Sequence, residues 1–388
     1  MNADPPRGGG PGTDAPDPGT GRRRALLRRW WPTLRVVIGF GVVGVALWAL
    51  SSHTDELSGL SQVLRTLNWF WVLMAIAAEF LSFVSFAWMQ RTLLGCGGLP
   101  APRGSLLKMT FASQALSNSL PGGTAVAAVY GFRWYRRFGA DSTLAGWATA
   151  GVVVASAVSL SLVASVGLAV AASEGASLDL IPAIVGVLVL AVAVGALFVY
   201  ERPLFLVVSG ALRLSHRLTG RPRGDNADQI DRVMLAVTSV RLGWSQVITV
   251  VTWGTANWLF DCTCFALMFP AVHAPIPWKG LLLAYGAGQL AAALPITPGG
   301  LGAVEGSITI ALVAFGGAQT TTVDAVLVYR LVSFWLVLVV GWCLLGELAL
   351  EVRLGRWRRR ALDSDVTASL VDPGGDVDGA VPAADGPT

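Results

Sequence analysis

Four ionisable side chains lie inside long apolar stretches of the sequence: Glu79, Asp261, Glu305 and Arg330. A charge in such a stretch is costly, so each of these residues is first considered functional. We expect Arg330 to pair with Glu305 or with Asp261, because a lone guanidinium there would be expensive. Two roles stay open for Arg330: a buried pair that keeps helices in register, or binding of a lipid phosphate, which suits its planar fork.

Two Pro-Gly-Gly words interrupt apolar segments near their middle, Pro121-Gly122-Gly123 and Pro298-Gly299-Gly300. Proline removes a backbone donor and glycine permits positive φ, so each word predicts a tight reversal between two half-helices. Irregular backbone at membrane depth survives only where protein or a water-filled cavity satisfies it, so each tip predicts a polar pocket. The glycines could instead serve only the close approach of helices.

The second word continues through Leu301 and Gly302 into another half-helix. The free N–H groups at such a start favour an anion, and a phosphate would fit there. Glu305 would lie about one and a half turns into this half-helix and could face the same cavity. On the first hairpin we expect an uncharged polar lining that includes Asn118 and Tyr130, although these side chains could equally form hydrogen bonds between helices.

The composition determines which elements must position these residues. The 388 residues are 54% hydrophobic and only 13% charged, against about 25% charged in a soluble domain, which excludes a soluble enzyme. The fold class predicted is an all-α polytopic membrane protein, because its apolar runs reach the roughly 20 residues needed to cross a bilayer. We expect six full transmembrane helices, at about 33–50, 69–90, 143–172, 178–200, 245–270 and 324–349, and two re-entrant helical hairpins, at about 104–132 and 279–316.

The distribution of basic residues predicts the orientation, because cytoplasmic loops collect Lys and Arg. Of the 28 basic residues, seven lie in the N-terminal tail, six in 91–141, seven in 201–241 and five after Glu351. These four regions belong on the cytoplasmic side only if 104–132 enters and leaves on that side, as a hairpin does. For 279–316, a hairpin and two full spans both return the chain to the side of the membrane where it entered, so the basic residues do not distinguish them. The short arms favour the hairpin.

A faint internal repeat relates the two halves. The words Phe86-Ala87-Trp88-Met89 and Phe265-Ala266-Leu267-Met268 end corresponding spans, and the Pro-Gly-Gly words follow at a similar offset. The repeat units, about 69–172 and 245–349, would have opposite orientations, as in many secondary transporters. They form part of a transmembrane domain at 33–350, between a disordered basic cytoplasmic tail (1–32) and a basic, then acidic, disordered cytoplasmic tail (351–388).

The long word from Leu294 to Gly306, LPITPGGLGAVEG, with Tyr329-Arg330 and Trp335 later on, resembles the lysylphosphatidylglycerol synthase transmembrane (flippase-like) family. The resemblance covers about 35–350. The first hairpin departs from it, because no acid follows Gly122-Gly123 where relatives often carry one. The resemblance implies movement of a phospholipid, such as an aminoacylated phosphatidylglycerol. With about 38 residues after the last span, we expect the membrane part without the soluble aminoacyl-transferring domain.

These observations lead to one functional hypothesis and one alternative. The hypothesis is a flippase-like protein of the cell (inner or plasma) membrane, multi-pass with both termini cytoplasmic, that translocates a phospholipid or other lipid-linked anion. The alternative is an accessory or scaffold protein that binds a lipid-linked intermediate for a membrane glycosyltransferase. The expected partners are a membrane phospholipid and either a second copy or a membrane enzyme. We expect no nucleic acid, metal, cofactor or enzymatic activity, since no Asp-rich metal motif and no nucleophile with a base occurs.

Overall fold

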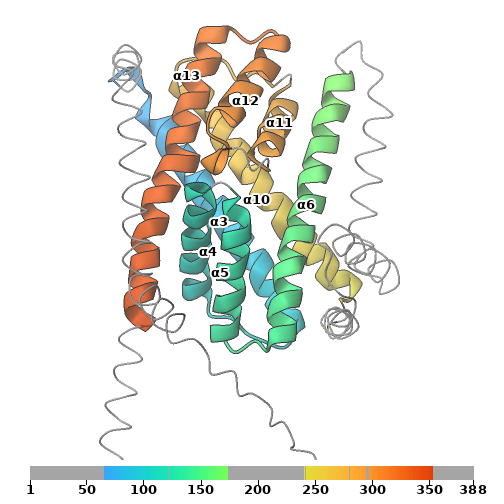
Figure 1. The fold of residues 1–388 in the computed structure, drawn as a ribbon. Coiled ribbons are helices and arrows are strands. Elements are labelled where there is room, and N and C mark those ends of the chain that lie inside the picture. Colours follow the sequence, from blue (N-terminus) through green and yellow to red (C-terminus); the bar gives the residue numbers. More distant parts are fainter. Residues whose placement is uncertain are drawn as a thin grey trace, which may run out of the picture. The chain divides into compact units, whose positions relative to one another are not determined.

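A computed structural model of the chain describes residues 65–120, 122–173, 240, 242–278, 280–293 and 297–352. Within these ranges the regular elements are all helical (Figure 1). The expected spans at 33–50 and 178–200, the tail at 1–32 and Pro121 lie outside the described residues, as does the second tail beyond Val352.

The first half of the described chain is a long helix, two shorter ones and another long helix. They are α3 (Trp69–Cys96), α4 (Arg103–Ser119), α5 (Gly123–Arg137) and α6 (Ser142–Ser173). Asn68 starts α3, because its side chain accepts a hydrogen bond from the Phe70 N–H at 3.2 Å. Gly122, with φ of 65°, separates α4 from α5, a left-handed conformation that glycine adopts readily.

The second half has the same order of long and short helices. It contains α10 (Trp244–Ala271), α11 (Leu281–Ala293), the short turn η2 (Pro298–Gly300), α12 (Ala303–Ala314) and α13 (Gln319–Arg330). A π-helical stretch, η3 (Leu331–Leu336), then leads into further helix, and the whole last helix runs to Val352.

Three helices of the described residues are long and apolar enough to cross a membrane, judged by length and composition: Trp69–Cys96, Ser142–Val170 and Gln319–Val352. They cover three of the expected spans. The fourth expected span within the described residues, 245–270, is the 28-residue helix α10, which lies outside that apolar set. Large apolar side chains such as Phe70, Leu73 and Ile310 are exposed on the bundle surface.

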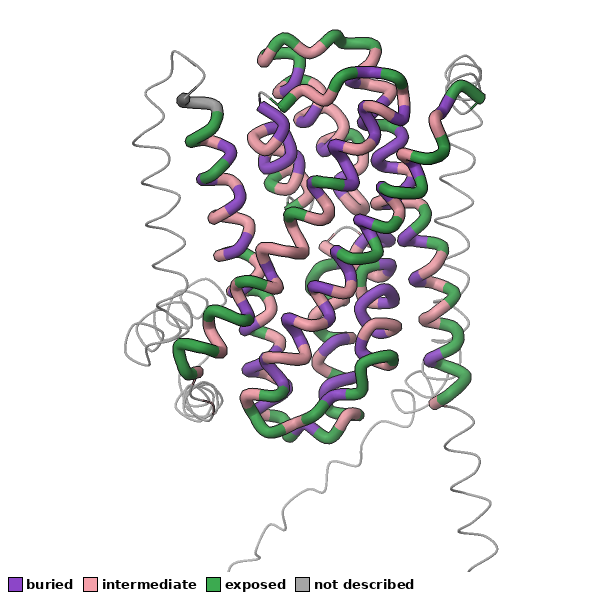
Figure 2. The backbone as a smooth tube through the Cα atoms, turned by 180° about the vertical axis from the view of Figure 1, so that it is seen from behind, coloured by how far each residue is buried: buried purple, intermediate pink, exposed green. Residues whose placement is uncertain are grey.

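The long helices α3 and α10 form the centre of the bundle and run antiparallel. The Asn68 N–H donates to the Ala271 carbonyl at 2.9 Å, and the Asn257 amide donates to Ser82 Oγ at 2.7 Å. The helix α10 also packs on α6 and α13 (Figure 1). Buried and exposed positions alternate along the helices (Figure 2), as expected where one side of each helix contacts its neighbours.

The two pairs of short helices each fold back as a helical hairpin: α4 packs on α5, and α11 packs on α12. In Figure 1 the α4–α5 pair occupies the lower half of the bundle and the α11–α12 pair the upper half. Gly123 allows the first reversal, because a Cβ there would lie 2.2 Å from the Ser117 carbonyl oxygen. The η2 turn contacts α4, so the second hairpin reaches the first.

Two details of the predicted elements are corrected. The helix α12 begins at Ala303 and not at Leu301, because Gly299, Gly300 and Gly302 have φ of 57°, 69° and 82°. Glu305 is therefore in the first turn of α12. The last long helix begins at Gln319 and not at 324, which places Arg330 about three turns into it.

Candidate functional site

The tip of the second hairpin is a compact turn that requires glycine. The Gly300 N–H donates to the Thr297 carbonyl at 3.2 Å, and the Thr297 hydroxyl donates to the Leu301 carbonyl at 2.9 Å. A Cβ on Gly299 would lie 2.1 Å from Phe334 Cε2. The turn is therefore pressed against the π-helical stretch of the last helix, and no larger residue fits at this position.

Arg330 connects the last helix to this tip. Its Nε donates to Glu305 Oε1 at 2.6 Å, and its Nη2 donates to the Gly299 carbonyl at 2.9 Å. The guanidinium also lies over the Phe334 ring, 4.7 Å from its centroid. Arg330 is only 8% exposed. Of the two acids considered from the sequence, Glu305 is the one that binds Arg330, and the pair is largely shielded from solvent.

Glu305 uses its second oxygen to cap its own helix. Oε2 accepts the Gly302 N–H at 2.7 Å, so the carboxylate lies at the N-terminal end of α12. The protein itself therefore supplies one anion at this N-terminus, and binding of a phosphate there stays a prediction. The sequence predicts Glu305 further along this half-helix, because it does not show that the glycines delay the start of α12.

The guanidinium of Arg330 retains donors for another anion. Two of its five N–H groups make the contacts to Glu305 and Gly299. The others point to no acceptor among the described residues. An arginine that is already oriented by a carboxylate and a carbonyl can offer its remaining fork to a phosphate without losing much conformational freedom.

The first hairpin contributes to this region in a different way. Gly122 and Gly123 form its tip, while the Asn118 amide oxygen accepts from the Gln114 side chain at 3.2 Å within α4. Tyr130 packs 6.2 Å from the Trp134 ring, in the cluster around α4, α5 and α6. The structure therefore brings Pro298, Gly299, Gly300, Gly302, Glu305 and Arg330 together, and leaves Tyr130 in a separate cluster.

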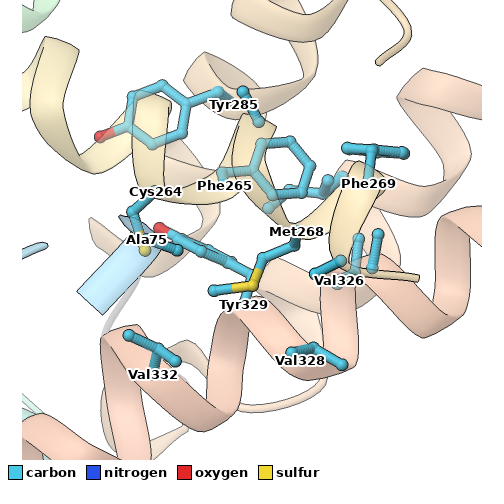
Figure 3. Close-up of a cluster of buried hydrophobic side chains, with 14 of the residues drawn as sticks. Ala75, Cys264, Phe265, Met268, Phe269, Tyr285, Val326, Val328, Tyr329 and Val332 are labelled. Atoms are coloured by element: carbon cyan, nitrogen blue, oxygen red, sulfur yellow. The ribbon is translucent and has the colours of Figure 1, made fainter. Parts of the chain in front are cut away.

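The two remaining acids meet between α3 and α10. Glu79 is 7% exposed and lies beside Asp261. Asp261 accepts hydrogen bonds from the Tyr285 hydroxyl at 2.8 Å, the Tyr329 hydroxyl at 2.9 Å and the Gln289 amide at 3.2 Å. Figure 3 shows Tyr285 and Tyr329 in the buried cluster that also contains Cys264 and Phe265. We call Glu79, Asp261, Tyr285, Gln289 and Tyr329 the carboxyl cluster.

The sequence predicted the pairing of Arg330 with Glu305, but it did not single out Tyr285 and Tyr329 as partners of Asp261, or Phe334 as the ring beneath Arg330. Tyr285 and Tyr329 are two of only five tyrosines in the chain, and both interrupt apolar segments. A hydroxyl in such a segment needs an acceptor, which was the available signal. Phe334 gave no such signal, because an aromatic side chain is common in an apolar helix. The described residues hold no group of three or more His, Cys, Asp or Glu side chains arranged for a metal ion.

Comparison with known proteins supports the sequence resemblance. Residues 36–341 match the family model described as "Lysylphosphatidylglycerol synthase TM region". A "UPF0104 membrane protein" of Methanothermobacter thermautotrophicus is 31% identical to this chain over 101 residues, which cover 25% of this chain and 30% of that protein. The aligned region thus spans about a third of this relative.

Proposed function

This chain belongs to the lysylphosphatidylglycerol synthase TM region family of membrane proteins, and we propose that it moves an anionic phospholipid, or another lipid-linked anion, between the leaflets of its membrane. The family model covers the hairpins and most of the last helix, so the proposed site lies within the matched region.

The observation that carries the proposal is the environment of Arg330. A buried arginine at the tip of a helical hairpin is held by Glu305 and the Gly299 carbonyl, and its other N–H groups have no acceptor among the described residues. Burying an arginine is expensive, and a pair that only joined helices could be replaced by apolar packing. A lipid phosphate can bind the free side of the fork while the acyl chains stay in the bilayer.

The short helices support a re-entrant arrangement. As helices, the 13 residues of α11 and the 12 residues of α12 extend about 20 Å and 18 Å, less than the roughly 30 Å of a hydrocarbon core. We propose that both hairpins enter the membrane from opposite sides and meet near its middle, as an inverted repeat would require. The distribution of basic residues supports cytoplasmic positions for both termini, and the proposed location is the cell membrane.

Movement of a lipid requires no covalent step, so the proposed function is transport and not catalysis. Arg330 would bind the phosphate, and Glu305 would keep the guanidinium oriented. The tip glycines would let the headgroup approach the backbone, because they carry no side chain. The first hairpin has no acid of its own beside Gly122, so its part would be to form the wall opposite η2, which it contacts through α4.

A lipid-movement assay tests the proposal. The purified protein is reconstituted into liposomes that contain fluorescent phosphatidylglycerol, and a membrane-impermeant quencher reports the label that reaches the outer leaflet. The label already in the outer leaflet is quenched first, and the label that crosses from the inner leaflet is quenched in a second, slower phase. We expect this second phase to be faster than in protein-free liposomes prepared in the same way. Equal rates would overturn the proposal. Phosphatidylglycerol that binds without moving would instead support an accessory role, in which a lipid-linked intermediate is held for another enzyme.

A further inference from the structure

The carboxyl cluster has an unequal distribution of hydrogen-bond partners. Asp261 receives three donors, from two tyrosine hydroxyls and one amide. This set satisfies a carboxylate, which only accepts hydrogen bonds. Asp261 is therefore arranged as the anion of the cluster.

Glu79 has the opposite environment. Its side chain is buried against α10, and its Oε2 has no hydrogen-bond partner among the described residues. It lies beside Asp261 and Cys264, and neither offers it a positive charge. An ionised carboxylate whose one donor is the weak Cys264 thiol, next to a second carboxylate, would be strongly unfavourable in this position. A bound proton removes that cost and gives Glu79 a hydroxyl that can donate to Asp261.

The titratable and charged groups around Glu79 and its neighbour Asp261 come from three helices. Asp261 and Cys264 of α10 and Tyr329 of α13 interact with Glu79 itself, whereas Tyr285 of α11 and, further away, Arg330 of α13 interact with Asp261. Arg330 is the single cation of this set, and its Nε is already bound to Glu305. These groups therefore include one carboxylate, Asp261, and no free cation that could balance the charge of an ionised Glu79.

Adjacent residues of α13 connect the carboxyl cluster to Arg330 and the tip of the second hairpin. Tyr329 donates to Asp261, and the next residue, Arg330, donates to Glu305 and Gly299. Immediately after them the helix widens into the π-helical stretch Leu331–Leu336, a feature that often marks functional sites. Any change in the hydrogen bonding of Asp261 would thus act on Tyr329 and, through the backbone, on Arg330.

We propose that Glu79 is a proton-binding site, and that loading and release of this proton are coupled to lipid movement at the Arg330 tip. The coupling rests on the function proposed above, whereas the proton site does not. When Glu79 releases its proton, the added negative charge beside Asp261 competes for the tyrosine hydroxyls. Tyr329 then shifts, and Arg330 is displaced relative to Glu305. The proton is taken up from one side of the membrane and released to the other, so no other reactant is needed.

A proton fits this cluster better than a metal ion. The described residues include no set of three or more acidic, His or Cys side chains placed for a metal. Glu79 and Asp261 are the two acids of the cluster, and the donors around Asp261 already occupy its oxygens. A monovalent cation between the two acids is the competing occupant, and the experiment below distinguishes it.

The proton site is tested first without transport. Infrared difference spectra of the purified protein between neutral and alkaline pH should show the C=O band of a protonated carboxylic acid, which shifts in D₂O. We expect this band to be lost in Glu79→Gln and kept in Glu347→Gln, a matched change at an exposed acid. Glu79→Gln mimics the protonated side chain, so it should fold as well as the wild type. A band that persists unchanged in Glu79→Gln overturns the proton site.

Coupling is tested in liposomes with an imposed pH gradient. We expect the wild type and Glu347→Gln to move fluorescent phosphatidylglycerol faster in one direction of the gradient, and Glu79→Gln to lose this dependence. Wild-type movement that ignores the pH gradient, or that follows a Na⁺ gradient at constant pH, overturns proton coupling while lipid transport stands. Absence of any lipid movement would defeat the proposed function, and the infrared band would still decide the proton site.

Discussion

Arg330 Nε lies 2.6 Å from Glu305 Oε1, which joins the last long helix to the first turn of the second hairpin's outgoing arm. The same carboxylate caps that arm at Gly302, and the same guanidinium holds the carbonyl of Gly299. Two side chains therefore fix the geometry of the tip from both ends.

Removing both partners of the buried pair should cost less than the sum of the two separate removals. Glu305→Leu or Arg330→Met alone leaves an uncompensated buried group, and we expect each to lower the free energy of unfolding by about 3 kcal/mol. The Glu305→Leu and Arg330→Met double variant should cost less than the sum of its single changes. Thermal unfolding in detergent, followed by tryptophan fluorescence, measures these differences. Strictly additive losses would show that the two side chains are not coupled.

Gly299→Ala should destabilise the tip. The residue has φ of 57° and a Cβ would lie 2.1 Å from Phe334 Cε2. The left-handed conformation costs an alanine about 1–2 kcal/mol, and the steric clash adds about 1–3 kcal/mol. Combining Gly299→Ala with Phe334→Ala should recover the steric part of this loss and keep the conformational part. Gly306→Ala, in open space on α12, is the matched control and should be well tolerated.

The hydroxyls that bind Asp261 should matter more than a hydroxyl that binds a neutral group. Tyr285→Phe and Tyr329→Phe each remove a hydrogen bond to a carboxylate, for which we expect a loss of about 1.5–3 kcal/mol. Tyr135→Phe removes a bond to the neutral Gln90 amide, 2.7 Å long and equally buried, and should cost about 1 kcal/mol. Chemical or thermal unfolding of the three variants ranks them, and an equal cost for all three would argue against an anionic Asp261.

The exposed ion pair of Lys108 with Glu347 should contribute nothing measurable. It joins α4 to the end of the last helix, but both side chains are accessible to solvent. Water and salt screen such pairs, and side-chain entropy opposes them. We expect Lys108→Ala to unfold at the same temperature as the wild type and to move lipid at the same rate. A clear loss of either property would reveal a contribution of α4 that the contact does not explain.

Much of the local fold was accessible from the sequence. The apolar arms around Pro298 predicted α11 and α12 to within a few residues, and the cost of a buried charge predicted a partner for Arg330. Proline and glycine identified the turns, because their backbone preferences do not depend on tertiary context. The same reasoning located Glu79 and Asp261 as unusual residues, but not as neighbours.

What the sequence could not show depends on tertiary geometry. The inverted repeat predicts opposite orientations for α3 and α10, but the spacing of residues does not reveal that the two helices pack with Glu79 beside Asp261. It also does not reveal that Tyr329 and Arg330, adjacent in the chain, bind acids on different helices. The positive φ values after Pro298 delay the start of α12, so Glu305 also caps this helix at Gly302, which the sequence did not show.

The initial rate of fluorescent phosphatidylglycerol movement in liposomes that contain Arg330→Ala, compared with wild type and Lys108→Ala at equal amounts of folded protein, tests the central claim most directly. We predict that Lys108→Ala matches the wild type and that Arg330→Ala falls to the rate of protein-free liposomes. Lipid movement by Arg330→Ala at the wild-type rate would contradict the claim that the arginine at the hairpin tip handles the headgroup.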